Sequence, residues 1–410
     1  MSTHRTGPGH AARPRQPERT LAALASLLCS AALGAGCDET DPASATPSPD
    51  SPAPAASTAS ASGAPSATAT ATVDAGTDAP PEPDCAEYAA KWGEHDRWPG
   101  TFEEQNQLLL DQLECVHQLG TAAMAPLREM FGKAKRMGQG NPAVARHPVT
   151  VAQCQEGLRR RGETFRVPDH ERICGAKYMA PLYDPKTQKP GQAKACIDLF
   201  EFPNIPCTYP VTWVRANEAA EICTALGKRI CDAHEWEGAC AGQVLPPDYD
   251  FDRVKNKKHK EAVKTMRSLH NGRIEKTKRW AYGDEYRKGV CATSSKKSKD
   301  CGVGWRKCGT NTFPSGHFPD CKSPLGVYDQ HGNAAEHMNL PLIADHMASG
   351  PNDRLGVTEM KGSWFVFDQI RAHQDHCRWR APFWHGTRIR NENSHRNYHL
   401  GFRCCKTVGD

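Results

Sequence analysis

The stretch that decides the fold reads Gly326-Val-Tyr-Asp-Gln-His-Gly-Asn-Ala-Ala-Glu336, within a chain of 410 residues. Its two carboxylates, Asp329 and Glu336, are seven residues apart, and Gly332 between them allows a sharp turn. Such a turn offers several oxygen atoms to one point, and oxygen is the ligand that a hard cation prefers. The stretch therefore predicts a calcium site, unless the two carboxylates only cap turns.

The segments that precede this stretch predict short regular elements. Residues 210–214 (Pro-Val-Thr-Trp-Val) read as a strand, and the apolar spacing within 219–226 predicts a helix that Gly227 ends. A second helix is predicted to follow Asp232, a good N-cap residue, with Glu235 at the capping-box position. The later sequence is rich in Gly, Pro and Asn, so we expect a compact α+β domain held by loops and disulfides.

Cysteine usage points away from a reducing cytosol. The sequence has 18 cysteines, and the 16 that follow Cys37 are an even number, as a full set of disulfides requires. The adjacent Cys404 and Cys405 are expected to pair with different partners, and Cys301–Cys308 is a candidate local bridge. The rest of the connectivity cannot be read from the sequence.

Six segments resemble motifs of the formylglycine-generating enzyme (sulfatase-modifying factor) family and occur in the family's order. They are Cys196–Asn204, Gly227–Glu237, Trp280–Asp284, Gly326–Glu336, Lys361–Trp364 and Gly401–Cys404. The resemblance covers residues 174–410 and implies the family's irregular, loop-rich α+β fold, which is related to C-type lectins. It also implies a structural calcium ion, with ligands from the Asp329 carboxylate, the Gly332 and Ala334 carbonyls, and Glu336.

One of the family's two copper-binding cysteines is missing. The active enzymes of the family oxidise a substrate cysteine to formylglycine with molecular oxygen, using copper(I) bound by two cysteines. The first position corresponds here to Val366, and the second resembles Cys377, in Cys377-Arg-Trp-Arg380. Ala335 also replaces the aromatic residue that usually follows the family's Gly-Asn motif. One cysteine cannot form a bis-thiolate site, so ordinary formylglycine generation is not expected.

Two functions remain open. In the first, the domain is a binding module whose groove holds an extended peptide or a glycan near Ser363, Trp364, Arg378 and Arg380. In the second, it is an oxygen-dependent oxidoreductase with a remodelled copper or iron site, where Cys377 and Ser363 would be catalytic.

Histidines in the same region supply further candidate ligands for such a metal. They are His373, His376, His385, His395 and His399. Imidazole and thiolate together suit copper, zinc or iron. The alternative is that these histidines only make hydrogen bonds and that Cys377 forms a disulfide.

The first 36 residues read as a secretory signal peptide. A basic start precedes an apolar stretch from Leu21 to Gly36 that is too short for a membrane span. The stretch ends in Leu33-Gly-Ala-Gly-Cys37, which resembles a bacterial lipobox and predicts lipidation of Cys37. Residues 37–84 are mostly Ala, Ser, Thr and Pro, which predicts a disordered tether. We therefore expect a lipid-anchored protein of the bacterial cell envelope, periplasmic or surface-exposed.

A helical segment over residues 85–173 is predicted between the tether and the domain. Its apolar spacing predicts a helical hairpin over about 86–135, which a Cys85–Cys115 disulfide would staple. No cofactor motif occurs in it.

Residues 241–279 read as a basic insertion in the domain. Between Asp252 and Arg279 there are 11 Lys or Arg and three acidic residues. The favoured interpretation is a solvated helix, and the alternative is a surface for an anionic partner. A whole-chain charge of only +5 and the lack of interleaved aromatic side chains argue against nucleic acid.

Overall fold

The computed structural model describes Cys85 and residues 100–296, 298, 301, 304–352, 354–366, 376–381 and 386–409. The predicted signal peptide (1–36), the tether (37–84) and the lipidation site Cys37 lie outside these residues. No helix in the described part is long and apolar enough to cross a membrane.

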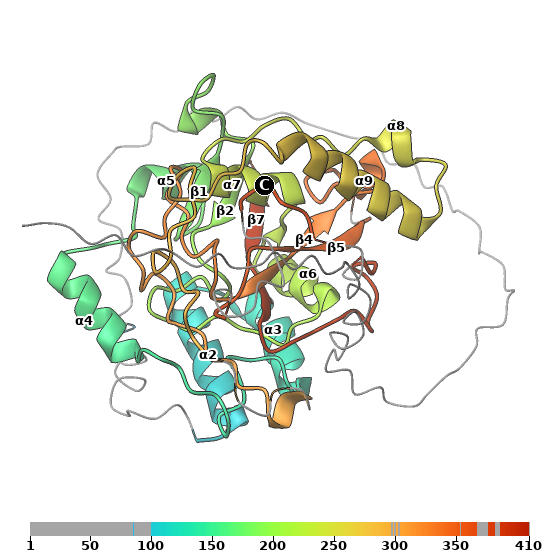
Figure 1. Cartoon of the computed structure of the whole chain (residues 1–410). Helices are drawn as coiled ribbons and strands as arrows, with labels where there is room; N and C mark the ends of the chain where they lie inside the picture. Colours follow the sequence, from blue (N-terminus) through green and yellow to red (C-terminus); the bar gives the residue numbers. More distant parts are fainter. Residues whose placement is uncertain are drawn as a thin grey trace, which may run out of the picture.

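Two small sheets form the centre of the domain (Figure 1). The first is antiparallel with strand order β1-β2-β7-β3, formed by β1 (Met179–Leu182), β2 (Ala195–Asp198), β7 (Cys404–Thr407) and β3 (Arg229–Ile230). The second has the order β5-β4-β6, formed by β5 (Val357–Lys361), β4 (Ala335–Leu340) and β6 (Leu400–Phe402). Strand β4 runs antiparallel to β5 and parallel to β6. Every residue of β1, β2, β4 and β5 is buried, so these strands are covered on both faces.

Helices and loops surround the two sheets (Figure 1). The helices are α2 (Phe102–His117), α3 (Thr121–Lys133), α4 (Val151–Arg161), α5 (Pro168–Cys174), α6 (Ala216–Ala225), α7 (Ala233–Ala241), α8 (Phe251–Val254) and α9 (His259–Ile274). Short 3-10 helices lie at Pro190–Gln192, Gly304–Arg306 and Ala344–His346. The mixture of helices, small sheets and long loops confirms the predicted irregular α+β fold.

Helices α2 and α3 form the predicted hairpin. Helix α2 begins with a capping box, in which the Thr101 hydroxyl and the Glu104 carboxylate each accept the other residue's backbone N–H at 3.1 Å. The hairpin buries Leu113 and Leu127 in one apolar cluster with Ile222 of α6, so it packs on the domain rather than standing apart. The Cys85–Cys115 disulfide is present as expected.

The predicted strand over 210–214 is wrong. Only an isolated bridge between Thr212 and Gly138 occurs there, and Trp213 has a φ of 56°. A positive φ in a non-glycine residue turns the chain out of the extended conformation. Burial of the Trp213 ring, which is 2% exposed, selects this backbone over strand propensity.

Helix α7 begins where the sequence predicted, with half of the expected capping box. The Glu235 carboxylate accepts the Asp232 N–H at 2.8 Å. The Asp232 carboxylate instead accepts the backbone N–H groups of Ala348 and Ser349, at 2.9 and 3.0 Å. It therefore holds a distant loop against the start of α7, a role that local spacing cannot reveal.

Eight disulfides pair all sixteen cysteines from Cys85 onward. They are Cys85–Cys115, Cys154–Cys207, Cys174–Cys196, Cys223–Cys404, Cys231–Cys405, Cys240–Cys377, Cys291–Cys321 and Cys301–Cys308. The expected local bridge and the separate partners of the two adjacent cysteines are confirmed. A fully bridged set of this size indicates an oxidising compartment outside the cytosol.

Helix α9 of the basic insertion is only partly solvated, in contrast to the favoured interpretation. One face of the helix is buried, and Val263 and Met266 pack with Leu340 and Val357 of the second sheet. Arg267, which had counted among the solvated cations, is buried and pairs with Glu359 at 2.7 Å. The insertion is therefore an integral layer of the domain.

Arg403, between β6 and β7, joins the two sheets. Its guanidinium donates two hydrogen bonds of 2.7 Å to the Glu336 carboxylate at the start of β4. Its other N–H groups reach the carbonyls of Asp198, Leu199 and Tyr328 at 3.0–3.2 Å. All five guanidinium donors are thus used, and the side chain is fully buried.

We predict that Arg403→Met lowers the free energy of unfolding by about 3–5 kcal/mol, because it leaves a buried carboxylate unpaired. Denaturant unfolding with the disulfides intact measures the change. The control is Arg159→Met, which removes an exposed ion pair with Glu156 and should cost less than about 0.5 kcal/mol. A loss below about 1 kcal/mol for Arg403→Met would show that the two sheets do not depend on this contact.

Candidate functional site

Cys377, a predicted catalytic residue and metal ligand, is bonded to Cys240 of α7. Both cysteines are fully buried. Neither sulfur is a thiolate in this state, so the expectation of a catalytic or copper-binding thiolate at Cys377 does not match the structure.

His331 lies beside this disulfide. Its Nε2 is 3.3 Å from the sulfur of Cys240 and 3.7 Å from that of Cys377. Cys240, Cys377 and His331 form a possible metal-binding group, because their ligand atoms all lie within 4.8 Å of one another. No other group of three or more His, Cys, Asp or Glu side chains in the described part of the chain meets this distance. The same Nε2 accepts the backbone N–H of Ala281 at 2.8 Å, so its lone pair is already engaged. A soft metal could bind here only after the disulfide is reduced and this amide moves.

The predicted histidine ligands do not join this cluster. His373 and His385 lie outside the described residues. The described His376 packs edge-on against Trp280, and burial lowers its pKa to about 4. His399 stacks on Trp364, with ring centroids 4.5 Å apart. His395, the remaining predicted ligand, is also outside the cluster.

Sequence reasoning missed Cys240 and His331, although both lie inside quoted or adjoining motifs. His331 is in the deciding stretch itself, and Cys240 follows the motif of α7 by three residues. Neither has a partner at a recognisable sequence spacing, since Cys377 is more than a hundred residues away from Cys240. Only the fold brings them together.

The residues expected to line a binding groove are mostly buried. Ser363, Trp364 and Arg380 are 0%, 3% and 1% exposed. The Ser363 hydroxyl accepts the Gly332 N–H at 3.0 Å, so it stabilises the turn at Gly332 rather than facing a substrate. Arg378 is half-buried and donates to the Gln243 carbonyl at 2.7 Å. These four residues therefore do not form an open groove.

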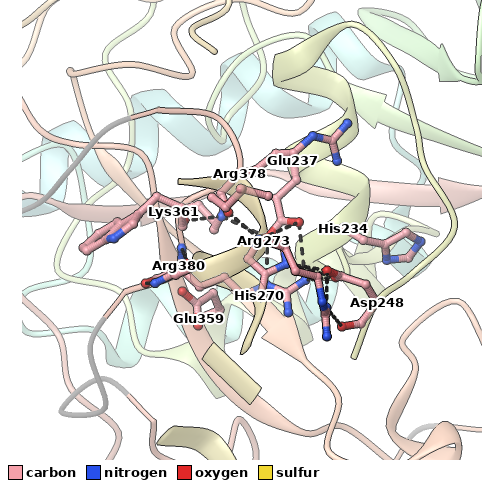
Figure 2. Close-up of polar contacts among 12 residues, drawn as sticks. His234, Glu237, Asp248, His270, Arg273, Glu359, Lys361, Arg378 and Arg380 are labelled. Carbon is pink, nitrogen blue, oxygen red and sulfur yellow. Dashed lines mark hydrogen bonds and ion pairs between the residues drawn. The ribbon is translucent and has the colours of Figure 1, made fainter. Parts of the chain in front are cut away.

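Arg380 belongs to a buried charge network centred on Glu237 of α7 (Figure 2). The Glu237 carboxylate accepts from Lys361 Nζ at 3.0 Å and from Arg380 Nε at 2.9 Å. Burial alone would raise the pKa of Glu237, but the charges of Arg380 and then Lys361 hold it well below its ordinary value. The carboxylate therefore stays ionised and fixes two buried cations.

Helix α9 extends this network to the segment that carries Cys377 (Figure 2). His270 Nδ1 contacts the Asp248 carboxylate at 2.8 Å, and His270 Nε2 lies 2.6 Å from the Arg378 carbonyl oxygen. Asn271 exchanges hydrogen bonds with the backbone of Arg380 at 2.9 and 3.0 Å. The basic insertion thus positions residues 376–381 and encloses the Cys240–Cys377 disulfide.

Glu336, one of the predicted calcium ligands, is already neutralised by a buried cation. Both oxygens of Glu336 are bound by Arg403, and one also accepts from Trp236 Nε1 at 3.0 Å. Within the described residues, the Asp329 carboxylate accepts one hydrogen bond, from the Gly316 N–H at 2.7 Å. Glu336 therefore does not fit the role of a calcium ligand in this arrangement.

Glu201 is an acidic neighbour that sequence reasoning did not identify. One of its oxygens accepts the Ala334 N–H at 3.3 Å, and within the described residues the other has no hydrogen-bond partner. Burial, and then the charge of Asp329, raises the pKa of Glu201 well above its ordinary value. Burial likewise raises the pKa of Asp329 to about 7. Two buried carboxylates are thus left without a cation, and their oxygens fit a hard cation, although not as a closely gathered cluster.

An open cavity of about 620 Å³ lies away from these buried groups. Its walls come from α6, β3, the end of β7 and the loop that Asp232 holds. It is lined by Ala220, Thr224, Arg229, Ile230, Ala348, Ser349, Gly350, Pro351, Asn352, Leu355, Arg390 and Thr407. Glu235 holds the guanidinium of Arg229 with contacts of 2.7 and 2.8 Å, which fixes one wall. The lining mixes hydroxyl, amide and apolar groups, as a peptide or sugar ligand requires.

Comparison with known proteins places these features in context. Residues 134–408 match the family model described as "Sulfatase-modifying factor enzyme 1-like domain". Among solved structures, the chain is similar to the crystal structure of CarF, with 14% sequence identity and a TM-score of 0.27, covering 66% of this chain and 85% of that one. No curated protein matches the chain significantly. The matched region begins before residue 174, where the sequence motifs had placed the start of the domain.

We predict that, in mature protein carrying Cys37→Ser, none of the sixteen cysteines from Cys85 onward reacts with an alkylating reagent in denaturant without reductant. Each sulfur is already bonded, so intact-mass measurement should show no added label. Cys377→Ser should add one label, at Cys240, and the matched variant Cys301→Ser should add one at Cys308. Label on wild-type Cys377 would contradict the disulfide assignment and restore a thiolate to this site.

Proposed function

Because the chain belongs to the sulfatase-modifying factor enzyme 1-like family over residues 134–408, we propose that it is a binding module built on this fold. The observation that carries the proposal is the state of the sulfur atoms. Val366 stands at one expected copper position, and Cys377 at the other is consumed in a disulfide with Cys240. The fold is kept while the bis-thiolate that copper(I) requires is lost.

The proposed ligand is a peptide or glycan of the bacterial envelope, bound in the 620 Å³ cavity. The residues first expected to bind it, around Trp364, are buried, whereas the cavity is open and carries fixed polar groups. The signal peptide and lipobox-like sequence support a lipid-anchored protein in that compartment, where peptidoglycan supplies both chemistries.

A second candidate function is an oxygen-dependent oxidoreductase with a remodelled metal site. The meeting of Cys240, Cys377 and His331 favours it, since two thiolates and an imidazole suit copper or iron once the disulfide is reduced. We rank it second because all three groups already have partners: the sulfurs each other, and the imidazole the Ala281 amide.

One set of measurements separates the two functions. Mature protein carrying Cys37→Ser is incubated with purified peptidoglycan sacculi and sedimented, and separately with a cysteine-containing peptide, copper(I) and air. We expect co-sedimentation and no aldehyde product by mass spectrometry. An aldehyde would support the second candidate, and protein that stays in the supernatant would contradict the binding module.

Filling the cavity tests its role directly. Asn352→Trp should weaken sacculus binding by about tenfold or more, equivalent to at least about 1.4 kcal/mol. The matched control is Gln107→Trp, at the separate cavity of about 250 Å³ between α2 and α3. Equal binding by the two variants would place the ligand elsewhere.

We also propose a structural calcium ion beside Asp329, with Glu201 taking the place expected of Glu336. The support is the Glu201 oxygen that has no hydrogen-bond partner within the described residues, together with the burial that raises the pKa of both carboxyl groups. The cation would neutralise the carboxylates of Asp329 and Glu201, which Arg403 does not contact, and would stabilise the turn within residues 326–336.

Calcium and pH should therefore have linked effects on stability. When a chelator has removed calcium, the free energy of unfolding should fall as pH rises from about 4 to about 7, by up to roughly 1.4 kcal/mol per pH unit. The reason is that folded Asp329, with a pKa of about 7, keeps a proton that the unfolded chain has released.

At pH 8, added calcium should raise the melting temperature of the wild type. Asp329→Asn should remove both the pH slope due to this group and the response to calcium, whereas Asp345→Asn, at an exposed site, should change neither. An unchanged melting temperature on adding calcium to the wild type would refute the ion.

A further inference from the structure

Charge is distributed very unevenly in this molecule. Residues 252–279 hold eleven basic and three acidic residues, a net charge of +8, while the whole chain carries +5. All the other residues together therefore carry −3. A positive segment on an otherwise slightly negative protein produces a directional electrostatic field.

The structure gathers part of this charge on one surface. We define the basic face as Arg253, Lys255, Lys258, Lys260 and Lys264, all of which are exposed. Lys260 and Lys264 are four residues apart on α9 and so lie on one side of it. Among the described ion pairs, only Lys255 of this set has one, a 3.4 Å contact with Asp252. Of the three acids of residues 252–279, Asp252 pairs with Lys255, Glu261 with the neighbouring Lys257, and Glu275 with Lys278.

The basic face is held in a fixed position by the buried side of α9. Arg267 pairs with Glu359 of β5 at 2.7 Å, and Arg267 also donates to the Thr358 carbonyl at 3.1 Å. Met266, on the same side, is fully buried. In Figure 1, α8 and α9 lie along one edge of the domain, away from α2 and α3. The cations are therefore presented together rather than on an isolated helix.

We propose that the basic face docks the domain onto an anionic phospholipid membrane surface. The proposal rests on the lipid anchor in the proposed function, which would hold the domain near such a surface. Forty-seven residues separate Cys37 from Cys85, a contour length of at most roughly 170 Å, so the anchor allows this edge to reach the bilayer. Lysine and arginine beside an anionic leaflet attract it, and the attraction falls off within a Debye length.

The contact is electrostatic rather than inserted. The exposed large hydrophobic residues in the described chain are Val167, Leu245, Tyr286 and Ile343, and none of them lies in α8 or α9. Without an apolar wedge, binding must depend on lipid charge and on salt. Both dependences can be measured.

The test uses mature protein with Cys37→Ser, so that no lipid is attached and failure of the anchor cannot affect the result. It is mixed with vesicles of phosphatidylcholine alone or with about one third phosphatidylglycerol, at 50 mM and 500 mM salt, and binding is measured by flotation. We expect binding only to the anionic vesicles, and a loss of about tenfold or more at the higher salt.

A charge-reversal variant identifies the surface. Lys258→Glu with Lys260→Glu and Lys264→Glu should reduce vesicle binding by at least about tenfold. The matched control reverses Lys186, Lys189 and Lys194, which are exposed on the β1–β2 connection, and should retain binding. Melting temperatures check that both variants fold.

Three results would overturn the proposal. These are no flotation with anionic vesicles at 50 mM salt, equal binding by wild type and the variant with Lys258, Lys260 and Lys264 reversed, or an equal loss in the control variant. Binding to purified sacculi that needs Lys258, Lys260 and Lys264, without vesicle binding, would assign the surface to a wall polymer instead.

Discussion

The contact between Arg403 and Glu336 is the constraint on which the other features depend. Arg403 lies where β6 passes into β7, so it belongs to both sheets at once. Its five donors engage one carboxylate and three carbonyls in a fully buried site. A buried guanidinium is tolerated only when it is paired and fully hydrogen-bonded, so the surrounding chain has little freedom to rearrange. The stretch Gly326–Glu336 is therefore fixed at its end relative to both sheets.

This constraint also determines what the domain can bind. Arg403 occupies Glu336, whereas Asp329 and Glu201 are buried carboxyl groups whose raised pKa values favour the protonated form. A second buried network, centred on Glu237, ties α7, α9 and the segment after Cys377 together. That network fills the region where a substrate groove was expected, and none of its residues lines the open cavity.

The basic insertion has two faces with different roles. Its buried face completes the core over β5 and positions the Cys377 segment. Its exposed face carries the cations for which we propose a membrane. A single helix can combine these roles because its residues point in directions set by the 3.6-residue period. Loss of the exposed lysines should therefore leave the fold intact.

The sequence by itself determined the family, the fold class, helices α6 and α7, and an oxidising compartment, because these follow from local spacing, ordered motifs and an even cysteine count. It failed at residues 210–214, where burial of Trp213 overrode strand propensity. Tertiary structure alone decided which distant groups meet: the Cys240–Cys377 bridge beside His331, and the buried Glu201 carboxyl group whose pKa the charge of Asp329 raises. It also showed that Trp364 and Arg380 are buried rather than open to a ligand. Pairing and burial depend on contacts between residues far apart in the chain, and local sequence patterns carry no record of them.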